Sequence, residues 1–137
     1  MALLALVHGW WGVWARFAPR HFFDTFPGFG HHWTAAYPPY NEHLVTDLGS
    51  TFLTLAFLLA VGAALDNRTV RWVVLAGTIV FSALHLGFHA FHAGSMSGSD
   101  LALSLTTLVV GVAFPVALLL LDRPTRFRRS ARGARQP

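Results

Sequence analysis

Residues 72–93 read WVVLAGTIVFSALHLGFHAFHA, an apolar stretch with no acidic or basic residue apart from three histidines. A helix needs about 20 apolar residues to cross a bilayer, and this stretch is long enough. Residues 48–65 and 101–121 are two further stretches of this kind. A fourth candidate, residues 1–17, has no basic start and no small-residue cleavage site, so we expect a retained helix and not a signal peptide.

The composition agrees with a membrane protein. The 137 residues are 54% hydrophobic and 12% charged, with a mean hydropathy of +0.50, whereas about a quarter of the residues of a soluble domain are charged. The sequence therefore predicts an all-α fold, a four-helix transmembrane bundle over residues 1–121 with an aromatic-rich outer loop between the first and second helices. Residues 122–137 hold too few apolar residues to pack, so we expect a basic, disordered cytoplasmic tail.

The absence of cysteine excludes several kinds of chemistry. Disulfides, thiolate metal sites, iron–sulfur clusters, covalently attached haem and cysteine nucleophiles all require a residue that the chain lacks. No phosphate-binding glycine loop, nucleophile elbow or nucleic-acid motif is present either. Any metal must therefore be held by nitrogen and oxygen.

The placement of arginine predicts the orientation in the cell membrane. All ten basic residues are Arg, and six of them lie in the last fifteen positions. Positive charge accumulates on the cytoplasmic side of membrane proteins. With the tail inside, Arg68 and Arg71 are inside too and only Arg16 and Arg20 are outside, so we expect a multi-pass protein with both termini cytoplasmic.

Each of three expected helices carries one polar stripe with helical spacing. The stripes consist of His43, Asp47, Ser50, Thr51 and Thr54; of Thr78, Ser82, His85, His89 and His92; and of Asp100, Ser104, Thr107 and Gly111. Polar residues of membrane helices usually face the interior. We therefore expect the three stripes to face one another, with their histidines and carboxylates together in the outer leaflet.

Imidazole and carboxylate side chains suit a transition metal: zinc, copper or iron, as one or two ions. His85 and His89 are one helical turn apart and can hold one ion, while His92 lies about 10 Å from His85 along the axis and favours a second ion or the edge of the site. His43 and Asp47 repeat the one-turn spacing. These five residues are the candidate metal ligands.

Asp47 and Glu42 are the candidate catalytic carboxylates. A histidine–aspartate pair can act as general base and acid on a lipophilic or quinone substrate that enters from the membrane.

Structural explanations compete with this hypothesis. A buried histidine–aspartate hydrogen-bond network would lock the helices together without binding a metal. Asn41 has the position of a helix N-cap, Glu42 suits the helix dipole, and Asp100 could cap the last helix. His8 could simply bond a neighbouring helix. His31 and His32 are expected to be solvated loop residues, although either could cover the site as a lid.

Two functions remain open. The first is an integral membrane metal-binding protein that performs oxidoreductase or hydrolytic chemistry on a lipophilic substrate. The second is a non-enzymatic accessory subunit of a membrane complex that binds metal or haem, the haem being held by two opposed histidines. Membrane lipids, and a homo-oligomer or larger complex, are the expected partners, and nucleic acid is not.

The segment FPGFGHHWTAAYPPYNEHLVTDLG at residues 26–49 and the segment LHLGFHAFH at residues 84–92 carry a resemblance. They resemble a family of small four-span integral membrane proteins of actinobacteria that is distantly similar to the DoxX-type family. The resemblance covers roughly residues 1–121. It implies a four-helix fold and, as the polar set of the family, Asn41, Glu42, His43, Asp47, His85, His89 and His92. It implies no particular reaction.

Overall fold

The computed structural model describes residues 1–122, so the predicted tail lies outside the described residues apart from Asp122. The elements are α1 (Ala2–Phe17), α2 (Pro19–Thr25), β1 (Pro27–Gly28), β2 (His31–His32), α3 (Glu42–Ala64), α4 (Arg68–Phe91) and α5 (Gly98–Leu121). The four expected helices correspond to α1, α3, α4 and α5. The segment expected to be a plain loop instead contains the short helix α2 and a two-stranded antiparallel hairpin.

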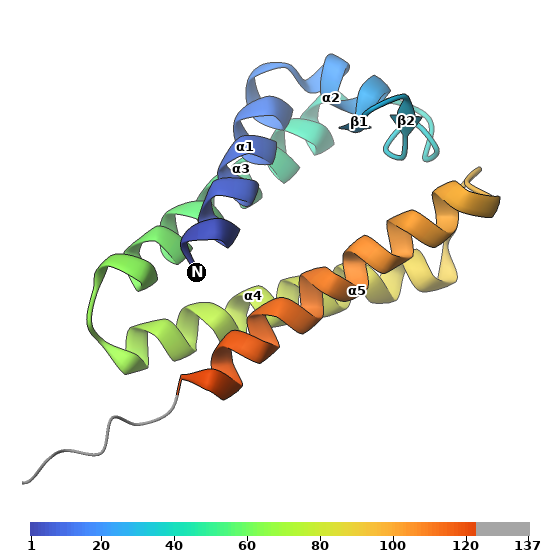
Figure 1. Cartoon of the computed structure of the whole chain (residues 1–137). Coiled ribbons are helices and arrows are strands. Elements are labelled where there is room, and N and C mark those ends of the chain that lie inside the picture. The colour runs from blue at the N-terminus through green and yellow to red at the C-terminus, as the bar shows by residue number, and fades with distance from the viewer. Residues whose placement is uncertain (123–137) are drawn as a thin grey trace, which may run out of the picture.

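The long helices are arranged as two pairs, α1 with α3 and α4 with α5, which are splayed apart over much of their length (Figure 1). The described residues thus form two helix pairs, and the expected four-helix bundle is not confirmed. The difference has a physical origin, because α3 uses a continuous buried face to pack against α1. It makes a much smaller interface with α4, to which it is joined by a short turn.

Small residues bring α1 and α3 together in an antiparallel arrangement. A Cβ atom added to Gly12 would lie 2.8 Å from the backbone nitrogen of Leu53. At the opposite end of the pair, a Cβ atom added to Gly62 would lie 2.5 Å from the side chain of Met1. Glycine at such points lets two helix backbones approach closely, which is a common way of packing membrane helices.

The two pairs meet at one end of the molecule, here called the closed end. Leu4, Leu59 and Val74 form a buried cluster there, with Met1 and Leu118 packed against it. The cluster thus joins residues of α1, α3, α4 and α5.

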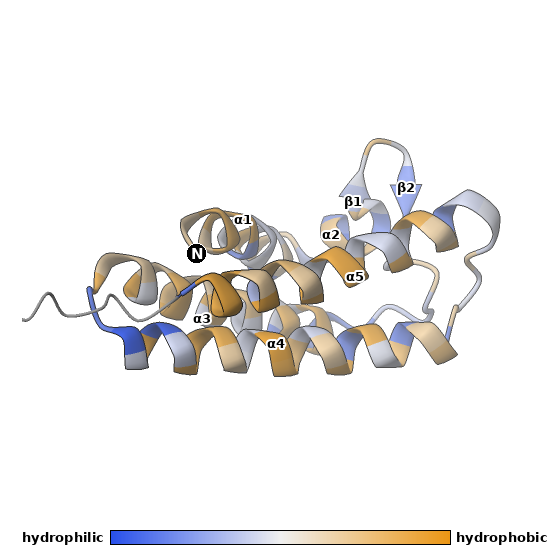
Figure 2. Ribbon diagram, turned by 60° about the horizontal axis from the view of Figure 1, so that its bottom comes forward, coloured by the Kyte–Doolittle hydropathy of each residue, from blue (hydrophilic) through white to orange (hydrophobic). Residues whose placement is uncertain are grey.

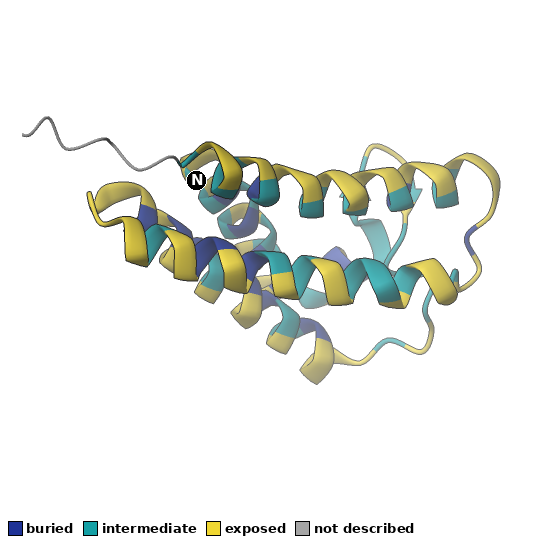
Figure 3. Ribbon diagram, turned by 90° about the horizontal axis from the view of Figure 1, so that it is seen from below, coloured by how far each residue is buried: buried dark blue, intermediate teal, exposed yellow. Residues whose placement is uncertain are grey.

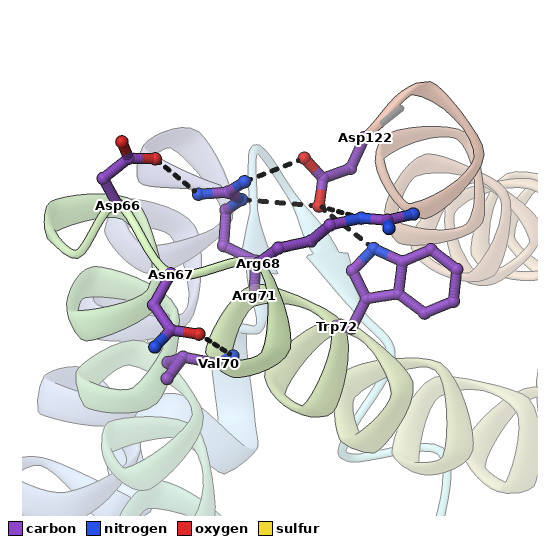
Figure 4. Close-up of polar contacts among 7 residues, drawn as sticks. All are labelled: Asp66, Asn67, Arg68, Val70, Arg71, Trp72 and Asp122. Atoms are coloured by element: carbon purple, nitrogen blue, oxygen red, sulfur yellow. Dashed lines mark hydrogen bonds and ion pairs between the residues drawn. The ribbon is translucent and has the colours of Figure 1, made fainter. Parts of the chain in front are cut away.

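A polar network surrounds Asp122 at the closed end (Figure 4). The carboxylate of Asp122 accepts hydrogen bonds from Arg71, at 3.0 Å, and from the indole nitrogen of Trp72, also at 3.0 Å. Arg71 also bonds Asp66 at 3.3 Å, and the guanidinium of Arg68 lies 4.6 Å from the centre of the Trp72 ring. These contacts fasten the end of α5 to the start of α4. They also lower the pKa of Asp122, chiefly because Arg71 donates hydrogen bonds to its carboxylate.

At the other end, the segment 26–41, which joins α2 to α3, reaches across to the second helix pair. We call this segment the strap. Its base is an aromatic cluster around Phe22 and Phe23. The amide of Ser95 donates to the carbonyl of Ala36 at 3.1 Å, and Nδ1 of His31 donates to Asp100 at 2.6 Å. The strap therefore holds the splayed ends of the helix pairs together.

Helix N-caps agree in part with the sequence predictions. The side chain of Asn41 accepts a hydrogen bond from the amide of Leu44, as expected of the N-cap of α3. Asn67 caps α4 in the same way. The expectation for Asp100 was wrong, because Ser97 occupies the N-cap position of α5 and Asp100 lies in the first turn, where it pairs with His31.

Within residues 1–122, α3, α4 and α5 are long and apolar enough to cross a membrane. The shorter α1 does not meet this length. Hydrophilic residues concentrate at the turn between α3 and α4, whereas the long helices are mainly apolar (Figure 2). Many apolar side chains are exposed on the outer faces of the helices, among them Leu6, Trp10, Phe57 and Leu84 (Figure 3). Exposed apolar surface on this scale marks a membrane or partner contact.

Candidate ligand cavity

A cavity of about 610 Å³ lies between the two helix pairs. Its walls come from α1, α2, α3, α4, α5 and the strap. Pockets that enclose small molecules commonly measure about 300–1,000 Å³.

The cavity lining is mainly apolar, and most of its polar side chains lie toward the strap. Toward the closed end its lining is apolar, with Leu3, Leu4 and Val7 of α1 and Val110 and Phe114 of α5. Toward the strap, polar groups gather from three elements. They are Thr34 and Tyr37 of the strap, Ser82, His85 and His89 of α4, and Ser104 and Thr107 of α5. A molecule with an apolar body and one polar end matches this arrangement.

Exposed apolar residues form part of the rim. Leu3 of α1 is 61% exposed and Val110 of α5 is 58% exposed, and both line the cavity. These two helices do not pack closely against each other. The cavity is therefore accessible between α1 and α5, on a side where the neighbouring surface is apolar.

His85 and His89 lie side by side on the α4 wall. Their ring centres are 4.6 Å apart, and the ring of His85 stacks on Phe81 with 5.7 Å between the centres. Both rings are partly buried and line the cavity. The structure thus brings together two of the five candidate ligands.

Tyr37 of the strap orients His89. Its hydroxyl donates to the carbonyl oxygen of His92 at 2.7 Å and lies 2.8 Å from Nδ1 of His89. Burial raises the pKa of Tyr37, so the phenol keeps its proton at neutral pH. Since that single proton is donated to the carbonyl, the hydroxyl accepts from Nδ1–H of His89. The other ring nitrogen, Nε2, then carries a lone pair that is free to accept a hydrogen bond or bind a metal.

His92 does not take part in the cavity. Its ring stacks on Phe88 with centres 4.6 Å apart, and its Nδ1 donates to the carbonyl of Phe88 at 3.1 Å. The side chain is exposed at the end of α4. Its distance along the helix from His85 explains why the two are not neighbours.

Glu42, His43 and Asp47 lie away from the cavity. His43 is 82% and Asp47 62% exposed, and the two form a pair at 3.4 Å with each other. Glu42 is exposed in the first turn of α3. The expectation that the α3 stripe faces the histidines of α4 is therefore wrong, because the buried face of α3 packs against α1. The stripes of α4 and α5 do face the cavity through Ser82, His85, His89, Ser104 and Thr107.

Among residues 1–122, no three His, Asp or Glu side chains are grouped so that they could hold a metal. His85 and His89 are two nitrogen donors without a carboxylate beside them. An ion bound there would need its remaining ligands from water or from a bound molecule.

Several cavity residues were not candidates from the sequence. His8 lines the α1 wall and donates from Nδ1 to the carbonyl of Leu4 at 2.8 Å, so it bonds its own helix and not a neighbouring helix as considered from the sequence. Tyr37, Trp33 and Thr34 line the cavity from the strap. The indole nitrogen of Trp33 and the hydroxyl of Thr34 are buried without a partner in the described structure. The spacing of these strap residues in the sequence does not distinguish them from other loop residues.

The other loop histidines have structural partners. His31 bonds Asp100, so it fastens the strap, and His32 donates from Nδ1 to the carbonyl of Asp24 at 2.5 Å. Neither lines the cavity.

No protein family matches the chain, and comparison with curated proteins and with solved structures finds no similar protein.

Proposed function

We propose that this is an integral membrane protein in which α1 lies in the bilayer beside the three longer helices. The outer side of α1 carries Leu3, Leu6, Trp10, Val13 and Phe17, all exposed. A helix of this length extends about 24 Å, somewhat less than the hydrocarbon core. Because α1 packs tightly on α3, it enters the membrane together with that helix. The fourth span belongs to this proposal, as does the resemblance to a four-span family.

The proposed orientation places the closed end in the cytoplasm. Arg68 and Arg71 lie at that end, and the chain continues from it into the arginine-rich residues 123–137. Arg16 and Arg20 lie near the strap. The positive-inside tendency then puts both termini in the cytoplasm and the strap on the outer side.

The proposed function is the binding of a lipophilic molecule that has one polar group. The amphipathic cavity is the observation that carries this proposal. Its apolar length would hold a ring system or a single chain, while its polar end would hold the head.

The chemistry of the polar end favours a hydroxyl or phenol head group. Nε2 of His89 is a free acceptor under the tautomer described above, so it suits a ligand O–H donor. An imidazole in this position can also take that proton as a general base. Asp47 and Glu42 have no part in this proposal because they are exposed on another face of α3.

The binding proposal is tested by identifying what copurifies with the protein. Gly111 lines the cavity and a Cβ added there meets no atom within 4 Å, so Gly111→Leu fills space without a clash at Cβ. Gly77 is also free of neighbours but lies outside the cavity, which makes Gly77→Leu the matched control.

Mass spectrometry of the gently solubilised protein should find one bound amphiphile in the wild type and in Gly77→Leu. At least a tenfold smaller amount is expected in Gly111→Leu. Equal occupancy in the two variants, or no bound amphiphile in the wild type after exposure to extracted membrane lipids, would overturn the proposal.

A transition metal on His85 and His89 is the second candidate function. The observation that favours it is the proximity of the two rings, together with the free Nε2 of His89. Nitrogen–zinc bonds are about 2.0–2.1 Å long, so adjacent imidazoles can share an ion. The ligand head group or water would fill the other positions, and oxidoreductase or hydrolytic chemistry would then occur at this end of the cavity.

Metal analysis separates this candidate from simple ligand binding. Wild type and His92→Ala are expected to retain one zinc, copper or iron ion per chain, whereas His85→Ala and His89→Ala lose it. Absence of stoichiometric metal in the wild type after loading with each ion would exclude the candidate. A Soret absorption band would instead identify bound haem, which is the property expected of the accessory-subunit alternative.

A further inference from the structure

The exposed face of α3 carries polar side chains on a helix that is otherwise suited to lipid. This polar face consists of His43, Asp47, Ser50, Thr51 and Thr54. All five residues are exposed in the single chain. They lie on the side of α3 opposite the residues that pack against α1, such as Val45 and Phe52.

Most of this polar face would lie within the hydrocarbon layer. Counting back about 20 residues from Leu65, the length needed to cross the core, reaches Val45. Asp47, Ser50, Thr51 and Thr54 follow Val45 and lie inside the hydrocarbon layer. His43 precedes Val45 and lies just outside the layer. This step rests on the proposal that α3 spans a membrane. By this count Asp47 lies two residues inside the layer, and acidic side chains within membrane spans usually face protein or a water-filled cavity.

The hydroxyl groups of the face are satisfied within the helix. Ser50 donates to the carbonyl of Thr46, Thr51 to that of Asp47, and Thr54 to that of Ser50, each at 2.9 Å. The carboxylate of Asp47 has a single ion-pair partner in the described structure, His43 at 3.4 Å. A carboxylate has about four acceptor positions, so most of its capacity is unused.

We propose that the polar face of α3 binds the same face of a second copy of the chain, with the two α3 helices parallel about a twofold axis along the membrane normal. The face is self-complementary, because it presents a basic imidazole and an acidic carboxylate one helical turn apart. That spacing is about 6 Å of rise, which side chains can bridge. In the dimer, Asp47 of each copy accepts from His43 of the other, and lipid is removed from both.

A second copy fits better than an unrelated partner because each copy supplies both members of the acid–base pair. Closed twofold association also gives a finite dimer in which the polar face of α3 is covered in both copies. The cavity rim between α1 and α5 is formed by other helices, so this dimer does not need to close the route to the ligand.

The absence of cysteine makes disulfide crosslinking a direct test. Ser50→Cys places a thiol on the polar face, and Leu84→Cys places one on α4 at a residue that is 72% exposed. Ser50 lies about two turns after the start of α3, and Leu84 lies about two turns before the end of α4. The two thiols therefore have similar depth in the membrane. Both variants are oxidised in native membranes and separated by size without reducing agent.

Ser50→Cys should give a disulfide-linked product of twice the chain mass, in at least fivefold greater yield than Leu84→Cys. Adding His43→Leu and Asp47→Leu to Ser50→Cys should remove most of that product. Equal crosslinking of the two single variants, or a product whose mass is not twice that of the chain, would overturn the dimer.

Extraction with alkaline carbonate tests the membrane proposal independently of the dimer. If the wild-type chain is released from the membrane fraction, the membrane proposal fails and the argument for the covered face fails with it. If the chain stays in the membrane and Ser50→Cys crosslinks no better than Leu84→Cys, only the dimer is refuted.

Discussion

Gly49 of α3 and Arg16 of α1 lie so close that a Cβ atom on Gly49 would be 2.5 Å from the backbone nitrogen of Arg16. The neighbouring atoms belong to the backbone, so no side chain can rotate away to make room. The contact sets how closely the first helix pair can pack.

Gly49→Ala is therefore expected to destabilise the protein, by about 1–3 kcal/mol, as overpacking of a tight interface commonly does. Gly77→Ala is the control, because a Cβ there meets no atom within 4 Å. That control should be neutral or more stable by up to about 1 kcal/mol, since alanine favours a helix over glycine. Thermal unfolding in detergent, followed by circular dichroism, measures both changes. Equal stability of the two variants would contradict the close contact.

Tyr37→Phe should weaken the attachment of the strap to α4. The variant loses the bonds from the phenol to His89 and His92, each worth about 0.5–1.5 kcal/mol. Tyr40→Phe is a matched control because the buried hydroxyl of Tyr40 has no partner within the described residues. Hydrogen exchange of the strap should accelerate in Tyr37→Phe and not in Tyr40→Phe. The same acceleration in both would mean that the phenol contacts of Tyr37 do not hold the strap.

The network around Asp122 predicts a dependence of stability on pH. The folded protein lowers the pKa of Asp122 below its ordinary value of 3.8. A carboxylate whose pKa is lower in the folded than in the unfolded state stabilises the folded protein at pH values above its unfolded-state pKa. This stabilisation disappears as the pH falls through its folded-state pKa. Asp122→Asn should therefore be less stable than the wild type at pH 7, with the difference shrinking as the pH is lowered below 3.8.

Asp66→Asn serves as the comparison for Asp122, because Asp66 also contacts Arg71 but is fully exposed. Its effect on the unfolding midpoint at pH 7 should be clearly smaller. A constant difference between Asp122→Asn and wild type from pH 7 to pH 3 would show that the charge of Asp122 does not contribute.

The His31–Asp100 pair should couple the strap to α5. Both side chains are partly exposed, so the coupling is expected to be about 0.2–1 kcal/mol, as for surface ion pairs. A double-mutant cycle with His31→Ala and Asp100→Ala measures it from unfolding midpoints. Strict additivity of the two changes would rule out a direct interaction. His32→Ala combined with Asp100→Ala provides the control, because His32 bonds Asp24 instead.

The long helices could be predicted from the sequence because each is an apolar stretch of sufficient length between polar turns. The inward direction of two stripes was also predictable. Thr78 and Ser104 are buried, and Ser82, His85, His89 and Thr107 line the cavity.

The direction of the α3 stripe could not be predicted from polarity alone. Helical spacing groups His43 with Asp47, but it does not say which neighbour the group faces. On α3 a second face, with Val45, Gly49 and Phe52, permits the close approach of α1 and turns the polar stripe outward. The metal hypothesis thus loses its α3 ligands in the single chain and keeps only His85 and His89.

The role of the strap was beyond sequence reasoning for a different reason. Tyr37 lies 52 positions from His89 in the sequence, and His31 lies 69 positions from Asp100. Such contacts depend on the path of an irregular segment, which has no periodic pattern to reveal it.

The separation of His31 from Asp100 has a consequence for biosynthesis. All residues of the α1–α3 pair lie within positions 1–64, so the whole pair has been translated before α4 and α5. The helix α5, which contributes one wall of the cavity and the carboxylate that bonds His31, is translated last. Because α5 residues line the cavity, the cavity is complete only after this last helix has been translated.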